Sequence, residues 1–293
     1  TYYSLSTITG IPADVLTVGS TRVLRLLAKG ETLSRTIDNT INYLNPIYQV
    51  FASIQENNTY TFKEAMRQTD NHRFFEAMMK ELIDHDSRGH WGIKTRAELN
   101  YPKTIMSIWS FKRKRLPNGE ISKYKARLCA HGGQQQWGVN YWETFSPVVN
   151  WMSVRLLLII SLIHDLPARS IDFVLALPQA DLDVPVYMEM PQGIDVQGDK
   201  EGKHIFVLKK SLYGLKQASY NWFEKLKGAL QKRGFESSQI DPCVFISKNM
   251  IILVYVDDWI LLAKDKSAID HFITSLTAKD KDGNKELEFT DDG

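Results

Sequence analysis

Two adjacent carboxylates stand in the middle of an otherwise apolar segment, and this arrangement constrains the fold more than any other feature of the chain. Asp257 and Asp258 interrupt Met250–Ala263, whose other residues are all apolar. An unpaired carboxylate costs several kcal/mol to bury, and two adjacent ones also repel each other. The pattern therefore predicts two buried strands joined by an acidic turn. That turn either faces solvent or, because both arms are expected to be buried, holds a divalent cation.

A third carboxylate, Asp172, has similar surroundings. It lies in the β-type run Arg169–Ala176, where an ion pair with Arg169 is the simpler explanation of its position. If the three carboxylates instead lie together at strand ends, they are suited to hold two Mg²⁺ ions about 4 Å apart. Oxygen ligands favour Mg²⁺ or Mn²⁺ over zinc.

The rest of the pattern mixes helices and strands without regular alternation. Thr61 and Glu64 carry the signature of a helix-capping box. Apolar spacing predicts helices over 71–84, after Asn150, and over 219–233. Strand-like runs are expected at 105–114, 122–130, 168–175, 204–208, 243–247, 250–255 and 259–263. Asn118-Gly119 between the first two runs predicts a β-hairpin. The expected class is therefore α+β.

The charge is unevenly distributed, although the net charge is only +2. Eight basic residues and a single acid, Glu120, lie between Lys103 and Arg127. Most of these basic residues fall on the predicted hairpin. A basic hairpin of this kind suits a polyanion.

Several other classes of protein do not fit the sequence. The two cysteines, Cys129 and Cys243, are far apart and match neither a disulfide framework nor a zinc site. The apolar run Val154–Ile163 is too short to span a membrane and suits a core helix. Residues 1–60 have weak periodicity and are expected to form a poorly structured tether.

Five sequence blocks resemble one known family. Tyr255-Val256-Asp257-Asp258 resembles the Tyr-x-Asp-Asp box of reverse transcriptases. Four further blocks resemble the copia-type retrotransposon (Pseudoviridae) branch, in the same order: KYKARLCAHG at 123–132, YWETFSPVV at 141–149, DLDVPVYMEMPQG at 181–193, and SLYGLKQA at 211–218 followed by Trp222. The resemblance covers about residues 62–293. It implies the fingers (about 61–165) and palm (about 166–293) of a right-hand polymerase, with an antiparallel palm sheet packed on helices.

The resemblance also implies roles for individual residues. Asp172, Asp257 and Asp258 fall on the catalytic carboxylates, which would hold two Mg²⁺ ions, with Mn²⁺ as a substitute. The implied nucleotide-binding residues are Lys125, Arg127, Phe173, Leu177, Gln217 and Tyr255. Lys125 and Arg127 would grip the incoming triphosphate through charge-assisted hydrogen bonds, unless they form only a solvated basic hairpin. Gln217 would pack near the nucleotide sugar, unless it is simply the residue that opens a helix.

Two positions depart from the family pattern. The family usually has Phe or Tyr five residues after the first catalytic Asp, as a steric gate against the ribose 2′-hydroxyl, and Leu177 stands there. A smaller gate puts discrimination between dNTPs and rNTPs in question. The family also usually has a small polar segment such as Asn-Gly where this chain has Pro178-Gln179-Ala180.

The implied function is RNA-directed DNA synthesis on an RNA or DNA template-primer, with dNTPs as substrates and no membrane association. One alternative is an inactive retrotransposon-derived fragment that keeps the fold and at most binds nucleic acid. Another is a structural domain with an acidic turn. The resemblance implies that the chain stops before the thumb and ribonuclease H domains. It also implies a Pol polyprotein working in a cytoplasmic virus-like particle, with the nucleus as the alternative location.

Overall fold

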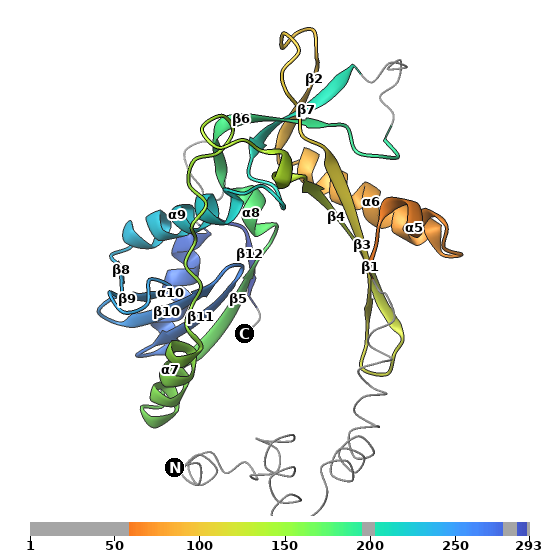
Figure 1. Ribbon diagram of the computed structural model, residues 1–293. Coiled ribbons are helices and arrows are strands. Elements are labelled where there is room, and N and C mark those ends of the chain that lie inside the picture. The colour runs from red at the N-terminus through yellow and green to blue at the C-terminus, as the bar shows by residue number, and fades with distance from the viewer. Residues whose placement is uncertain (1–58, 195–202, 278–285, 292–293) are drawn as a thin grey trace, which may run out of the picture. The chain divides into compact units, whose positions relative to one another are not determined.

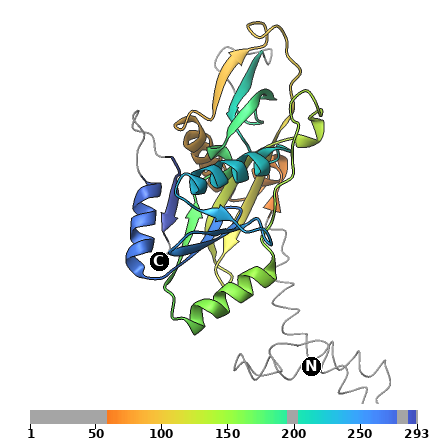
Figure 2. The ribbon, with the colours of Figure 1, turned by 90° about the vertical axis from the view of Figure 1, so that its left-hand side faces the viewer.

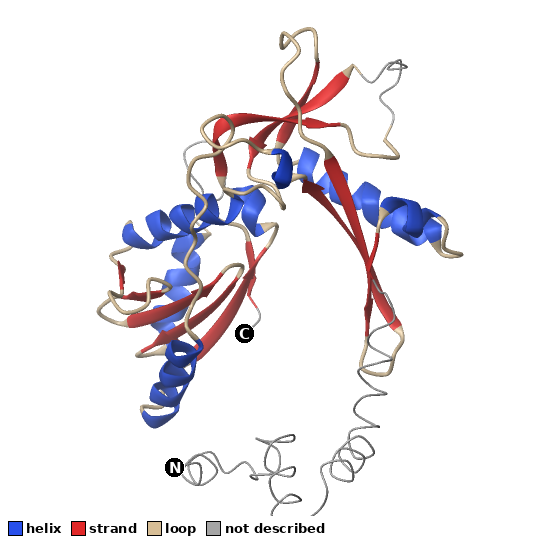
Figure 3. Ribbon diagram, in the orientation of Figure 1, coloured by secondary structure: helices blue, strands red, loops and turns tan. Residues whose placement is uncertain are grey.

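The computed structural model describes residues 59–194, 203–277 and 286–291 (Figure 1). All of them belong to one compact unit that begins at Thr59. The predicted tether, residues 1–60, lies outside the described residues except for Thr59 and Tyr60. Helices mix with three sheets whose strands all pair antiparallel, which confirms the α+β class (Figure 3).

The first sheet has the order β1-β3-β4 and contains the predicted hairpin. Its strands are β1 (Thr59–Tyr60), β3 (Ser107–Arg115) and β4 (Ile121–Ala130). Helices α5 (Phe62–Met66) and α6 (Asn71–Asp86) accompany it, and α6 lies along the hairpin (Figure 1). The capping box is confirmed: the Thr61 hydroxyl accepts from the Glu64 amide, and the Glu64 carboxylate accepts from the Thr61 amide at 2.8 Å.

The second sheet has the order β12-β5-β11-β10-β9-β8. Its strands are β5 (Ala168–Phe173), β8 (Glu236–Ser237), β9 (Val244–Ile246), β10 (Met250–Tyr255), β11 (Asp258–Ala263) and β12 (Phe289–Asp291). Helices α9 (Ala218–Gln231) and α10 (Lys266–Leu276) pack beside it (Figure 2). Strand β5 ends two residues earlier than predicted because Leu175 adopts a left-handed conformation with φ +47°. The short helix α8 (Ala176–Gln179) follows.

The third sheet has the order β2-β7-β6, and two of its strands were not predicted. They are β2 (Trp91–Thr95) and β6 (Asp181–Glu189), on either side of the predicted β7 (His204–Lys210). Pro185 and two aspartates hide the strand pattern of β6. Since β6 is an edge strand with an irregular register, proline is tolerated there. A single 3₁₀ turn, η1 (Gly132–Gln134), follows β4.

Helix α7 (Trp151–Ile163) corrects one prediction. It forms where a core helix was expected, with Asn150 as its N-cap, but only Leu157 and Ser161 are buried among the described elements. Leu156 and Leu162 are 56% and 81% exposed, and much of the helix stands clear of the other described elements (Figure 2). The apolar repeat therefore predicted the helix but not what covers it. No described helix is both long and apolar enough to cross a bilayer.

Candidate functional site

The acidic turn is a two-residue hairpin loop under backbone strain. Tyr255 pairs with Asp258, so Val256 and Asp257 form the loop between β10 and β11. Val256 has φ +55°, a conformation that a β-branched residue rarely adopts and that costs about 1–3 kcal/mol. The Val256 carbonyl accepts a hydrogen bond of 2.8 Å from the indole N–H of the buried Trp222 on α9. This contact holds the strained turn in place.

Strand pairing brings the three predicted catalytic carboxylates to one end of the sheet. Asp172 on β5 lies directly opposite Asp258 on β11. Residues opposite each other share a face, with their Cβ atoms about 5 Å apart. The Phe173 amide donates to the Asp257 carbonyl at 2.9 Å, which ties the turn to β5. Opposed like charges destabilise a sheet, so this end of the sheet is suited to a bound cation.

An ion pair with Arg169 does not explain the position of Asp172, because residues three apart on a strand point to opposite faces. Its guanidinium binds Asp270 at 2.8 Å and Asp291 at 3.4 Å. Among the described residues, no three His, Cys, Asp or Glu side chains converge closely enough to count as a formed metal centre. The donor chemistry nevertheless fits a hard cation, since carboxylate oxygens are the ligands Mg²⁺ and Mn²⁺ prefer.

The outer face of the β3–β4 hairpin carries a basic stripe. Lys112 pairs with Lys125 and Lys114 pairs with Lys123, while Arg127 lies opposite Ser110. Burial lowers the pKa of Lys125, and the neighbouring Arg127 and Lys114 lower it further. Like charges in directly opposed pairs cost stability. Their presence is explained if this face binds a polyanion.

Arg127, in this stripe, lies over the ring of Tyr213, a residue that the sequence did not single out. The Arg127 guanidinium lies 4.0 Å from the centroid of the Tyr213 ring. Burial raises the pKa of Tyr213, Arg127 opposes that rise, and the charges of Asp257 and Asp172 add to it. Tyr213 is therefore within electrostatic range of both a triphosphate-binding candidate and the carboxylates. The aromatic residue before Gly214 in the SLYG block was the available signal.

The blocks at 123–132 and 211–218 pack directly against each other. This packing explains why glycine stands at positions 132 and 214. The Ala130 amide donates to the Tyr213 carbonyl at 2.8 Å. Gly214 has φ +89°, and a Cβ atom there would lie 3.3 Å from the Ala130 N and C atoms and closer still to its carbonyl oxygen. A Cβ atom at Gly132 would likewise press on the Gly214 peptide. This close approach keeps the end of β4, the strand that carries Arg127, next to Tyr213.

Comparison with known proteins agrees with this geometry. The family described as "Reverse transcriptase (RNA-dependent DNA polymerase)" matches residues 97–284, more than half of the chain. The chain belongs to the reverse transcriptase family. It is 33% identical over 214 residues to the "Retrovirus-related Pol polyprotein from transposon TNT 1-94" of Nicotiana tabacum, a match that covers 71% of this chain and 16% of that protein.

Two further relatives extend the similarity. The chain is 30% identical over 240 residues to the "Retrovirus-related Pol polyprotein from transposon RE1" of Arabidopsis thaliana, covering 80% of this chain and 16% of that protein. It is 28% identical over 240 residues to the "Transposon Ty1-DR5 Gag-Pol polyprotein" of Saccharomyces cerevisiae, covering 80% of this chain and 13% of that protein. The resemblance to copia-type elements is therefore confirmed. This reverse transcriptase chain spans about a sixth of the length of its plant relatives or less.

The other predicted nucleotide-binding residues of this reverse transcriptase lie in different surroundings. Tyr255 is 48% exposed beside the acidic turn, and Leu177 lies in α8 with 9% exposure. Phe173 is only 3% exposed and packs on Trp222 and Trp259 at centroid distances of 5.2 and 4.8 Å. Phe173 therefore packs in the core. Its predicted contact with the nucleotide remains a prediction.

Gln217 is also committed to internal contacts. It is 2% exposed and precedes α9 without capping it through its side chain. Its amide oxygen accepts from Gln135 at 2.9 Å, and its amide nitrogen donates to the Asn140 carbonyl at 2.9 Å. These bonds use the side chain to join the loop after β4 to the start of α9. They support the helix-entry alternative, while the contact with the sugar remains a prediction.

Proposed function

We propose that this chain is the RNA-directed DNA polymerase domain of a retrotransposon Pol polyprotein, joining dNTPs to a primer 3′-hydroxyl as a template directs. The observation that carries the proposal is the register that sets Asp172 opposite Asp258, with Asp257 in the adjoining turn. In the proposed arrangement, the β3–β4 sheet with α5 and α6 forms the fingers and the six-stranded sheet forms the palm.

The protein's contribution to this reaction is positioning and charge. Asp172, Asp257 and Asp258 would hold two Mg²⁺ ions, which when bound lower the pKa of the attacking hydroxyl and stabilise the leaving pyrophosphate. Lys125 and Arg127 would neutralise the triphosphate from the hairpin, with Arg127 held against Tyr213. Binding of the template-primer would be sensitive to salt, because the basic stripe replaces counterions on the phosphates.

The test is primer extension on an RNA template with Mg²⁺ and dNTPs. The wild-type chain is compared with the Asp257→Asn/Asp258→Asn double variant. A matched control is Asp183→Asn, which changes an exposed aspartate on β6. Extension by wild type and by the control, with none by the double variant, is the expected result. Equal extension by all three would overturn the assignment of the carboxylates.

A second candidate function is nucleic-acid binding without catalysis. One observation favours it: Leu177 stands where the family usually has the Phe or Tyr gate. Fluorescence anisotropy with a labelled template-primer separates the two functions. Salt-sensitive binding without any metal-dependent incorporation by wild type would support the binding function over the polymerase. In either case, the proposed setting is a polyprotein working in a cytoplasmic particle.

A further inference from the structure

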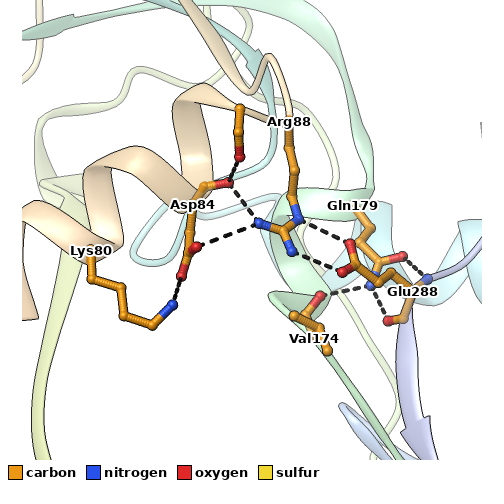
Figure 4. A network of polar contacts seen from close by, with 7 residues as sticks. Lys80, Asp84, Arg88, Val174, Gln179 and Glu288 are labelled. Atoms are coloured by element: carbon orange, nitrogen blue, oxygen red, sulfur yellow. Dashed lines mark hydrogen bonds and ion pairs between the residues drawn. The ribbon is translucent and has the colours of Figure 1, made fainter.

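The side chain of Gln179 joins the end of β5, the strand that carries Asp172, to the residue that precedes β12 (Figure 4). Its amide nitrogen donates to the Val174 carbonyl at 2.8 Å and to the Glu288 carbonyl at 2.7 Å. Its amide oxygen accepts from the Glu288 amide at 2.9 Å. The Val174 amide also donates to the Glu288 carbonyl at 3.0 Å. Val174 is two residues beyond Asp172, so Gln179 fixes the backbone where β5 ends.

An ion pair extends this junction to α6. The Arg88 guanidinium binds the Glu288 carboxylate through two nitrogen atoms, at 2.9 and 2.8 Å. A third nitrogen of Arg88 donates to the Asp84 carbonyl at 2.8 Å (Figure 4). The hydrogen bond to Glu288 raises the pKa of Arg88. A two-point fork fixes orientation as well as distance, so β12 is held in one position relative to α6.

The turn held by this junction is strained and carries the gate residue. Leu175 has φ +47°, which residues other than Gly, Asn and Asp rarely adopt. Such a conformation persists only where its surroundings enforce it. Lys225 on α9 donates to the Gln179 carbonyl at 2.8 Å and anchors the far end of the turn. Leu177 lies between these anchors.

We propose that Gln179 is a positioning residue for the polymerase reaction, setting both the strand end that carries Asp172 and the turn that carries Leu177. We call the hydrogen bonds of the Gln179 side chain to Val174 and Glu288 the latch. The Arg88–Glu288 ion pair couples this latch to α6. The inference rests on the proposed polymerase function. It assigns a role to the residue that stands where the family pattern has a small polar segment. A loss of the latch would shift the carboxylate and the gate without removing either.

The experiment measures single-turnover incorporation of dATP and ATP by the wild-type chain and by Gln179→Leu. Gln231→Leu is the matched control, because it makes the same substitution at an exposed position on α9. We expect Gln179→Leu to lower the rate of dATP incorporation about 10- to 100-fold and to change the ratio of dATP to ATP use, with template-primer affinity unchanged. A misplacement of about 1 Å is sufficient for a loss of about 100-fold.

A second variant distinguishes the loss of the Gln179 hydrogen bonds from a general loss of folding. Glu288→Gln keeps the backbone bonds to Gln179 and removes the charge that Arg88 binds, so its loss of rate should be smaller than that of Gln179→Leu. Equal dATP rates and equal sugar discrimination in Gln179→Leu and Gln231→Leu would overturn the proposal. A loss of rate in Gln179→Leu that is matched by an equal loss of template-primer affinity would overturn it as well.

Hydrogen–deuterium exchange separates this proposal from the function on which it rests. The Val174 and Glu288 amides should exchange faster in Gln179→Leu than in Gln231→Leu, because their bonds depend on the latch. Unchanged exchange would overturn the latch even in an active enzyme. A wild-type chain that incorporates no nucleotide would overturn the proposed function and the positioning role with it, whatever the exchange shows.

Discussion

Replacing Gly214 with Ala should destabilise the chain by roughly 2–5 kcal/mol. The left-handed conformation at φ +89° costs an L-residue about 1–2 kcal/mol. The new Cβ atom would also lie 3.3 Å from the Ala130 N and C atoms and closer to its carbonyl oxygen, and such overpacking typically costs about 1–3 kcal/mol. The two contributions add because the Ala130 backbone is itself held by the Tyr213 carbonyl and cannot simply move away.

Gly228→Ala is the matched control with the opposite expected sign. Gly228 lies within α9, where an added Cβ atom meets nothing within 4 Å. Alanine in a helix is favoured over glycine by about 0.5–1 kcal/mol, so this variant should be more stable than wild type. Urea unfolding followed by circular dichroism measures both, with equal m-values showing that the unfolded states are comparable. If Gly214→Ala unfolds at the wild-type midpoint, the close packing of these two sequence blocks is wrong.

Three further variants test other parts of the molecule. Trp222→Phe leaves the Val256 carbonyl without its donor and should cost at least about 1–3 kcal/mol in urea unfolding, and a wild-type midpoint would contradict this. The Arg113 hydrogen bond holds the pKa of Asp70 below its usual 3.8, so wild type should lose this contribution as the pH falls below about 4. Asp70→Asn should lack it at neutral pH and show a flatter pH dependence between pH 2 and 5; parallel curves would refute the pairing. Lys125→Gln should reduce the slope of log affinity against log salt by about 0.7–0.9 in anisotropy titrations, and an unchanged slope would place Lys125 outside the nucleic-acid interface.

Local signals predicted the elements whose determinants lie within a few residues. The Thr61–Glu64 capping box and the Asn118-Gly119 turn both formed, and Gly119 takes the positive φ of +87° that the turn requires. The helix predicted over 219–233 is followed by Gly234, which also has a positive φ of +78°. In each case, the stabilising contacts are made inside the segment itself. No knowledge of the distant chain is needed to predict them.

Features that depend on distant partners were missed. Strand β2 carries no strong β pattern of its own and exists through its pairing with β7, more than a hundred residues later. The early end of β5 at Phe173, before the left-handed Leu175, depends on the Gln179 side chain and on the backbone of Glu288. Tyr213 belongs to the candidate site only through the Arg127 guanidinium that lies over its ring, a residue far from it in the sequence. A single sequence gives the residue types but not these contacts.

The carboxylates lie together because of the apolar residues that alternate with them. Ile171 lies opposite Trp259 on the buried face, and both are 0% exposed. A slip of one residue between β5 and β11 would move Asp172 away from Asp258 and turn Ile171 and Phe173 outward. Exposing two such side chains costs roughly 3–6 kcal/mol, a large part of the stability of a typical domain. The register that forms the acidic site is therefore enforced by side chains that point away from it. Substitutions on that buried face should therefore change the proposed metal-dependent activity without altering any carboxylate.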